Sequence, residues 1–290
     1  MAVQSSQFLI RQAKPEDTAE CGRILYEGFV HINTKHGFPP DFPSPEHATG
    51  LLGNLFSHPG YHCVVAEEAG RLVGSNCVDE RGAIAGLGPI SVDPAAQNRS
   101  AGRQLMQTSI DHALGRGMDG VRLLQATFHN RSLSLYTKLG FDPREPISIM
   151  QGPPILKPVK GCHVRAATSA DAAEADRLCQ AVHGHTRTAE LLDGIASGSA
   201  QVVERDGAIT GYTSGLGFFC HSVGLATIDI QALISTADAF AGSGILVPTR
   251  NVELFRWCLT NGLRIVYPMT LMSMGFYQEP QGAYLPSVLY

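Results

Sequence analysis

Periodic hydrophobic positions predict a mixed α/β fold for residues 1–150. Apolar positions that recur at helical spacing predict amphipathic helices at residues 15–30, 46–57, 101–115 and 131–139. Short apolar runs bounded by turn residues predict strands at residues 7–12, 62–68, 71–80, 83–93, 119–127 and 141–150. Residues 31–47 hold four prolines, which predicts a loop or lid with at most a helical turn. Strand–helix–strand units in this order indicate a sheet flanked by helices.

The same pattern returns in the second half of the chain. Six positions of the first strand–helix unit recur at one offset, 165 − 11 = 154: Arg11, Ala13, Asp17, Ala19, Glu20 and Arg23 match Arg165, Ala167, Asp171, Ala173, Glu174 and Arg177. Gly70 of the predicted hairpin matches Gly207 at an offset of 137, and Asn130 matches Asn251 at an offset of 121. The falling offsets indicate a duplicated unit whose second copy has shorter connections. The alternative is a chance similarity of two alanine-rich helices.

The boundary between the two copies is predicted from its prolines. Residues 152–161 read Gly-Pro-Pro-Ile-Leu-Lys-Pro-Val-Lys-Gly, a stretch that cannot continue a helix or a central strand. We therefore expect a first domain at residues 1–151, a linker at residues 152–161 and a second domain at residues 162–290.

Composition narrows the class of protein. The chain has 290 residues, 44% of them hydrophobic, and a net charge of −4, which is typical of a folded globular protein and argues against a nucleic-acid partner. Its apolar runs are too short to span a membrane, and its first residues show no signal peptide, so we expect a cytoplasmic protein. The seven cysteines are widely spaced without a C-x-x-C motif, which predicts reduced thiols and no metal site. The sequence leaves open whether the protein forms a homodimer.

The strand end and helix start at residues 92–106 carry the clearest chemistry. Small residues precede the predicted helix at residues 101–115, and Arg99 and Arg103 add positive charge. The unpaired backbone N–H groups at a helix start, together with the helix dipole, favour an anion, and small side chains let a phosphate approach the backbone. This turn therefore predicts an anion site.

Two motifs resemble those of the GNAT superfamily of acyl-CoA N-acyltransferases. Val92, Pro94, Gln97 and Gly102 fit V-x-P-x-x-[RQ]-x-x-G-x-[GA], although Ser100 stands where glycine is usual. Leu135, Tyr136, Lys138, Gly140 and Phe141 fit the second half of N-x-x-A-x-x-[LF]-Y-x-K-x-G-F. Asn130 supplies the asparagine one residue closer to the tyrosine than in the motif, with Leu133 in place of alanine. The resemblance covers residues 7–150 and implies two tandem GNAT folds, each with a mixed, mainly antiparallel sheet flanked by helices.

The resemblance also implies a substrate and its binding residues. In the family this loop holds the pyrophosphate of acetyl-CoA, the asparagine contacts the pantetheine arm, and the tyrosine hydroxyl lies near the thioester sulfur. The residues implied here to contact acetyl-CoA are Ile90, Ser91, Val92, Gln97, Asn98, Arg99, Ser100, Ala101, Gly102, Arg103, Asn130, Ser132 and Tyr136. The acceptor would be a small amine or the amino group of a peptide.

The chemistry needs an acid, a base and an oxyanion donor. An amine of pKa about 10.4 must lose a proton before it attacks, and the departing thiolate must gain one. The resemblance implies Tyr136 as the acid and a backbone N–H near Ile90 or Val92 as the oxyanion donor; without the resemblance, Tyr136 reads as a core aromatic. Glu80 is our candidate base. The other candidates are Asp79, His129, His31 and His36.

Residues 31–47 lie where the family binds its acceptor. Phe38 and Phe42, with Asp41 and Glu46, are expected to line that pocket, although a plain proline-rich loop explains the composition equally well.

The second half lacks the loop motif. Counting back from Asn251 places the corresponding turn at residues 218–225, which contain no Gln/Arg-x-x-Gly-x-Gly. We therefore expect a degenerate copy without catalysis. Two other hypotheses remain open for the whole chain: an acyl-CoA-binding sensor that does not catalyse, and a scaffold.

Overall fold

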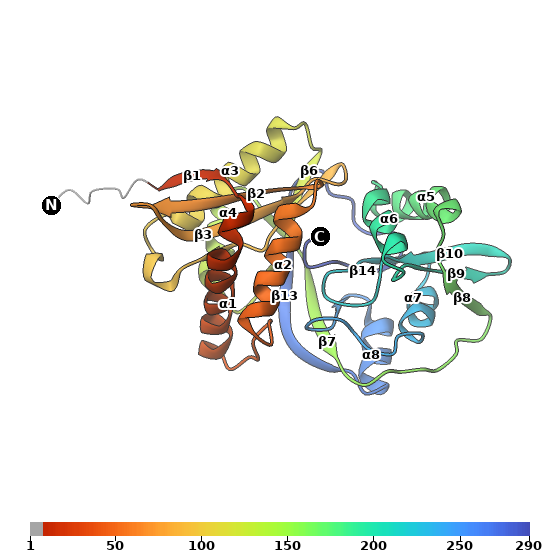
Figure 1. Cartoon of the computed structure of the whole chain (residues 1–290). Helices are drawn as coiled ribbons and strands as arrows, with labels where there is room; N and C mark the ends of the chain where they lie inside the picture. The colour runs from red at the N-terminus through yellow and green to blue at the C-terminus, as the bar shows by residue number, and fades with distance from the viewer. Residues whose placement is uncertain (1–7) are drawn as a thin grey trace.

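Helices and strands follow the predicted order in a computed structural model, which describes residues 8–290 (Figure 1). The first half contains β1 (Leu9–Gln12), α1 (Thr18–Lys35), α2 (Pro45–Ser57), β2 (Tyr61–Glu68), β3 (Arg71–Asp79), β4 (Ile84–Leu87), β5 (Ser91–Val92), α3 (Ala101–Gly115), β6 (Gly120–Ala126), α4 (Asn130–Lys138) and β7 (Asp142–Gln151). Short 3-10 turns, η1 (Pro15–Asp17) and η2 (Pro94–Ala96), precede α1 and α3.

The second half follows a similar order, with shorter counterparts of α1, α2 and α3. It contains β8 (Cys162–Ala166), η3 (Ser169–Asp171), α5 (Ala172–His183), α6 (Thr188–Ala196), β9 (Gln201–Arg205), β10 (Ala208–Thr213), β11 (Ser222–Gly224), α7 (Thr227–Ile234), β12 (Ile245–Pro248), α8 (Val252–Thr260), β13 (Arg264–Gly275) and β14 (Ala283–Leu285). The predicted mixed α/β class, with sheets flanked by helices, is confirmed. None of the helices within residues 8–290 combines the length and apolarity needed to cross a membrane.

Most predicted boundaries agree with the structure to within two residues, and two differ more. Helix α3 has the predicted bounds. Helix α1 continues to Lys35 and so takes in the first part of the predicted lid. The strand predicted at residues 83–93 divides into β4 and β5, because Gly88 and Pro89 interrupt it and proline has no N–H for the ladder. Residue 7, the first of the predicted strand 7–12, lies outside the described residues.

Strands of both halves combine in one sheet. A nine-stranded sheet has the order β1-β2-β3-β4-β6-β13-β7-β12, with β5 paired to β3, and a five-stranded sheet has the order β14-β11-β10-β9-β8. Strand β13 lies between β6 and β7 of the first half, where Figure 1 shows the halves meeting, and β7 in turn pairs with β12. The second half therefore contributes β12 and β13 to the nine-stranded sheet, which crosses the predicted linker, while the five-stranded sheet is built from the second half alone.

Burial on both faces explains why β13 holds this central position. Met272 is fully buried and packs with Val121 and Phe141 on one face of the sheet. Leu271 is buried in the cluster on the opposite face, which also contains Ile147. A strand that is apolar on both faces gains most from a central place in a sheet covered on both sides.

One ion-pair cluster occurs in both halves at the repeat offsets. Arg11 donates to Asp17 (2.7 Å) and to Glu67 (2.8 Å). Arg165 donates in the same way to Asp171 (2.8 Å) and to Glu204 (2.8 Å). In both copies the arginine lowers the pKa of the aspartate. The equivalent β-ladders also match, since Arg11 lies opposite Val65 and Arg165 lies opposite Val202.

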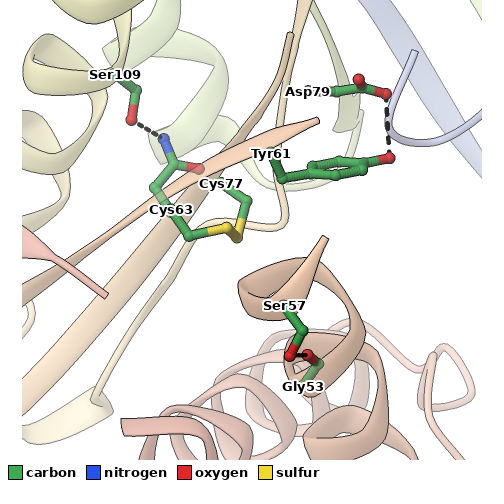
Figure 2. The surroundings of a disulfide bond; sticks show 8 residues. Gly53, Ser57, Tyr61, Cys63, Cys77, Asp79 and Ser109 are labelled. Carbon is green, nitrogen blue, oxygen red and sulfur yellow. Dashed lines mark hydrogen bonds between the residues drawn. A yellow bond between two sulfur atoms is a disulfide. The ribbon is translucent and has the colours of Figure 1, made fainter. Parts of the chain in front are cut away.

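The expectation that all cysteines are reduced is wrong for one pair. Cys63 of β2 and Cys77 of β3 form a disulfide bond (Figure 2), with their Cα atoms 4.1 Å apart. They lie directly opposite each other because an irregularity between Ala66 and Glu67 shifts the hairpin register. The other five cysteines are free thiols.

The helices of the first half cover opposite faces of its sheet. Helices α1 and α2 bury Cys21 and Leu52 against the face that carries Val65. Helix α3 buries Leu105 against the face that carries Val64. The turn that begins α3 thus lies on the opposite side of the sheet from α1 and α2, next to the end of β5.

Candidate functional site

The turn at residues 97–103 leaves its backbone donors open. The helical ladder of α3 begins with the Gln104 N–H, which donates to the Ser100 carbonyl oxygen (3.0 Å). Within residues 8–290, no N–H from Gln97 to Arg103 donates to a protein acceptor. Asn98 (φ 64°) and Ser100 (φ 75°) are left-handed, which produces the sharp turn before the helix. These N–H groups and the positive end of the helix dipole are therefore available to an anionic ligand.

Two arginines of this turn differ in availability. Arg99 is bound to Glu68 of β2, so its charge is compensated. Arg103, the third residue of α3, is exposed and has no ion pair within residues 8–290. Arg131 of α4 donates to the side chain of Gln97 (3.3 Å), which links α4 to the turn. The residues of the turn therefore fit a diphosphate, with Arg103 as the available cation.

The sheet diverges next to this turn. Strands β4 and β6 pair in parallel from Ile84–Gly120 to Gly86–Arg122, and β5 then pairs with β3 instead. The Asp93 N–H donates to Val73 of β3 (2.8 Å). Because successive N–H groups of a strand point in opposite directions, the N–H of Val92 points away from β3, toward the side on which β6 diverges.

The other residues of β5 lie at the same edge. By the same alternation, the N–H of Ile90 also points away from β3. The Ser91 side chain is buried, and its hydroxyl has no hydrogen-bond partner within residues 8–290. Ile90, Ser91 and Val92 thus connect the turn to the opening between β5 and β6.

Helix α4 places Tyr136 beside this opening. The Tyr136 ring is buried in the cluster that contains Leu87 and Met106, with Ile90 packed against it. Its hydroxyl has no hydrogen-bond partner within the described residues, and burial raises its pKa. Asn130 begins the helix and is exposed. The structure brings α4 and the turn together through Arg131 and Gln97.

Sequence reasoning missed Gln125, which organises the start of α4. Its side chain donates to the His129 carbonyl oxygen (3.0 Å) and to the Ser132 hydroxyl (3.0 Å). The Ser132 hydroxyl in turn donates to His129 (2.9 Å), so Ser132 is occupied by an internal contact. The side-chain amide oxygen of Gln125 (Oε1) is buried without a hydrogen-bond partner within residues 8–290. A polar residue inside an apolar predicted strand was the available signal.

Glu80 is not brought to this site. It contacts His112 (3.0 Å) and Arg116 (3.5 Å) in the last turns of α3. Eleven residues of helix, about 16 Å, separate His112 from the first residue of α3. Glu80 therefore lies at the end of α3 away from the anion site.

The other candidate bases are differently occupied. Asp79 binds Arg81 (2.9 Å) and accepts from the Tyr61 hydroxyl (3.1 Å). His129 lies next to α4, where burial lowers its pKa to about 4, so it is neutral at pH 7. His31 and His36 lie on the last turn of α1 and at its C-terminal cap.

The acceptor residues expected in the lid separate into two groups. Phe42 is buried in the core beneath α1 and α2, and Glu46 is exposed at the start of α2. Phe38 stacks on Phe128 of the β6–α4 connection, with 4.5 Å between ring centroids. Asp41 is partly buried and accepts from Asn33 (3.1 Å). Phe38 and Asp41 therefore face the β6 side of the first half.

The second half places its corresponding turn at Gly224–Thr227, some residues beyond the predicted position. Asp229, the third residue of α7, is fully buried and accepts from the Ala226 N–H (2.9 Å), Arg205 (3.1 Å) and Thr210 (2.7 Å). Strand β14 pairs with the free edge of β11. A cavity of about 500 Å³ adjoins the turn, and its Arg250 is already bound to Glu145. An internal carboxylate and an internal strand thus occupy the places that are open in the first half.

Metal ligands do not gather in the described chain. Across residues 8–290 there is no group of three or more His, Cys, Asp or Glu side chains that could hold a metal ion.

Comparison with known proteins supports an acetyltransferase. Residues 28–141 match the model of the acetyltransferase (GNAT) family. A stretch of 65 residues is 37% identical to mycothiol acetyltransferase of Nocardia farcinica (strain IFM 10152), and it covers 22% of this chain and 22% of that protein. The chain thus matches about a fifth of the length of this curated relative.

Solved structures share the fold over the whole chain. A candidate acetyltransferase from Pyrococcus horikoshii has a TM-score of 0.73 at 18% identity and matches 100% of this chain and 94% of its own. A GCN5-related N-acetyltransferase from Sphaerobacter thermophilus has a TM-score of 0.61 at 14% identity and matches 94% and 96%. The two-half architecture therefore occurs in proteins of this fold.

Proposed function

We propose, from the family match of residues 28–141 and the geometry of residues 90–136, that the first half is an acetyl-CoA-dependent N-acetyltransferase. The observation that carries the proposal is the set of unbonded N–H groups from Gln97 to Arg103 at the start of α3. Open donors at a helix start are satisfied by a ligand or by water, and a diphosphate provides the acceptor oxygens that this turn lacks. Asn98, Ala101 and Gly102 would contribute backbone donors, and Arg103 would contribute charge.

The chain's own groups supply the chemistry in this proposal. The N–H of Val92 or Ile90 would stabilise the oxyanion that forms when the amine attacks. Burial keeps Tyr136 protonated at neutral pH, as an acid requires. Since a raised pKa also makes full proton transfer to a thiolate less favourable, Tyr136 would act mainly by hydrogen-bonding the departing sulfur. Asn130 and Ser132 lie where the pantetheine arm would pass.

The base is not assigned to Glu80 in this proposal, because of its place at the far end of α3. His129 lies next to α4 and is the better candidate on position, but its lowered pKa makes it a weaker base than a free imidazole. The acceptor would be a small amine or a peptide amino group that enters on the α1 and α2 side of the sheet.

The second half would be a degenerate copy of the first, with residues 1–151 and 162–290 as the two units and residues 152–161 as the linker. The ion-pair cluster of Arg165, Asp171 and Glu204 at the repeat offsets supports the duplication. The carboxylate of Asp229 at its helix start supports the loss of an anion site there.

The Tyr136→Phe substitution tests the catalytic part of the proposal. We expect thiol release from acetyl-CoA in the presence of primary amines to fall about 100-fold, because the variant cannot donate to the sulfur. Acetyl-CoA affinity, measured by calorimetry, should not change. If wild-type protein binds acetyl-CoA but acetylates no amine, the second candidate holds: a non-catalytic acyl-CoA-binding module, which the absence of Glu80 from the site favours.

A further inference from the structure

A residue of α1 holds the segment between α1 and α2 in a defined conformation. Asn33 is buried, and its amide donates to the Pro39 carbonyl oxygen (3.0 Å) and to the Asp41 carboxylate (3.1 Å). The Phe38 N–H donates back to the Asn33 carbonyl oxygen (2.9 Å). Residues 36–42, called the wall below, are therefore ordered. A small number of hydrogen bonds fixes the position of this segment.

One of those contacts comes from the second half of the chain. The hydroxyl of Tyr267, on β13, donates to the Asp41 carboxylate across 226 residues of sequence. Tyr267 is only 3% exposed. Burial raises the pKa of Asp41, an effect opposed by the hydrogen bonds from Tyr267 and Asn33. Loss of the tyrosine hydroxyl would leave a poorly solvated carboxylate with one fewer donor.

The Tyr267 ring also contacts the aromatic residues that join this wall to the site. Its centroid lies 5.7 Å from that of Phe38 and 5.5 Å from that of Phe128. Phe38 and Phe128 stack on each other at 4.5 Å. Phe128 belongs to the connection between β6 and α4, so the three rings link the wall to the helix that carries Tyr136.

Strand β13 fixes that connection a second time. The Thr127 N–H donates to the Pro268 carbonyl oxygen (3.1 Å), and the hydroxyls of Thr127 and Thr270 are hydrogen-bonded (2.9 Å). Thus three neighbouring residues of one strand, Tyr267, Pro268 and Thr270, hold both the wall and the start of α4. Figure 1 shows β13 at the junction of the halves, where it can act on both.

We infer that Tyr267 is a positioning residue for the amine acceptor, which the second half contributes to the active site of the first half. The inference rests on the proposed acetyl transfer. In this arrangement Tyr267 holds Asp41, and through Asp41 the wall of residues 36–42, at a fixed distance from the β6–α4 connection. The second half then completes the acceptor site, while the acyl-donor site lies wholly in the first half.

The Tyr267→Phe variant of the full chain tests this inference, because it removes the hydroxyl and keeps the ring. A hydrogen bond to a charged partner is lost, so we expect the KM for the amine to rise about 10-fold, with kcat and the Kd for acetyl-CoA unchanged. We expect amide hydrogen exchange in residues 36–42 to accelerate about 10-fold as well. Tyr277→Phe is the matched control, since the Tyr277 hydroxyl makes no hydrogen bond within residues 8–290.

The two readouts separate the inference from the proposed function. Unchanged exchange in residues 36–42 would overturn the inference, as would an equal rise in the Kd for acetyl-CoA, which would indicate general loosening. Asp41→Asn retains one acceptor oxygen for Tyr267 but places its NH2 against that of Asn33, so exchange in residues 36–42 should accelerate in this variant as well. If primary amines are not acetylated by the wild-type protein, the proposed function fails, and the exchange of residues 36–42 still decides whether Tyr267 positions the wall.

Discussion

The helices α3 and α7 start at corresponding points of the two halves and carry opposite charges beside their first N–H groups. The third residue of α3 is Arg103, exposed beside open amides, whereas the third residue of α7 is Asp229, buried and bonded to the amide at its own helix start. Strand β14 covers the edge of β11, while the matching edge of β5 faces the divergence from β6. The buried carboxylate of Asp229 already compensates the positive end of the α7 dipole and would repel an anion. The start of α3 has no such carboxylate, so its N–H groups remain available to an external acceptor.

The largest expected effect concerns the closed helix start. Asp229→Ala removes a fully buried carboxylate and leaves Arg205, Thr210 and the Ala226 N–H without it. Breaking a buried pair in this way should lower the free energy of unfolding by about 3–5 kcal/mol. Chemical denaturation measures the loss. The control is Asp206→Asn, which removes an exposed charge 4.0 Å from Arg205 and tolerates the left-handed conformation of residue 206, so it should cost less than about 0.5 kcal/mol. Equal effects of the two variants would contradict the comparison.

The next effect transfers the carboxylate to the open helix start. Arg103→Asp places an acidic side chain at the third position of α3. There it can accept from the backbone N–H of Ser100, as Asp229 accepts from that of Ala226 in α7. It should weaken acetyl-CoA binding about 100-fold, because it removes a cation and adds a competing anion, whereas Arg103→Gln should cost about 10-fold. Calorimetry measures both. If Arg103→Asp binds acetyl-CoA like wild type, the anion site is elsewhere.

The smallest effect concerns buried histidines, which gather in the second half. Burial, reinforced by Arg122 and Arg187, lowers the pKa of His185 to about 3, against about 6.5 in an unfolded chain. Between these values the unfolded state binds more protons. The stability is therefore complete above about pH 6.5 and falls as the pH drops, by up to about 1.4 kcal/mol per pH unit for this residue.

His185→Asn removes that contribution. Its unfolding free energy should depend less steeply on pH between 6.5 and 4 than that of wild type, although the substitution itself lowers stability. His163→Asn, at an exposed residue of β8, should leave the slope unchanged. Identical slopes in all three proteins would show that His185 does not take up a proton on unfolding.

Local order was predictable where local chemistry decides it. Helix α3 has its predicted bounds because Ser100 precedes an amphipathic run that ends near Gly117. The disulfide was not predictable in this way. A plain two-residue hairpin in register from Glu68–Arg71 would place Cys63 opposite Asn76 and put Cys77 on the other face of the sheet. Only the register shift between Ala66 and Glu67 brings Cys63 opposite Cys77.

Long-range features of the site lay beyond the sequence. Strand β13 would show the same apolar pattern if it paired within its own half or between β6 and β7. Its place in the sheet of the first half could therefore not be predicted from periodicity. The Tyr267–Asp41 contact depends on that place of β13 between β6 and β7. Glu80 lies on a predicted strand next to a plausible site, but the face it occupies is set by the packing of α3. The turn before α3, by contrast, is set by local sequence and lies at its predicted place.

Acetyl-CoA binding to a Gly102→Glu variant is the most direct test of the claim that the open amides of α3 hold a diphosphate. A Cβ atom at Gly102 meets its nearest neighbour, Val92, at an ordinary 3.5 Å, so the variant should fold. The control, Gly50→Glu, makes the same substitution in α2, where nothing lies within 4 Å. We predict micromolar or tighter binding by wild type and Gly50→Glu, and at least a 100-fold loss in Gly102→Glu. Equal affinity of all three proteins would contradict the account.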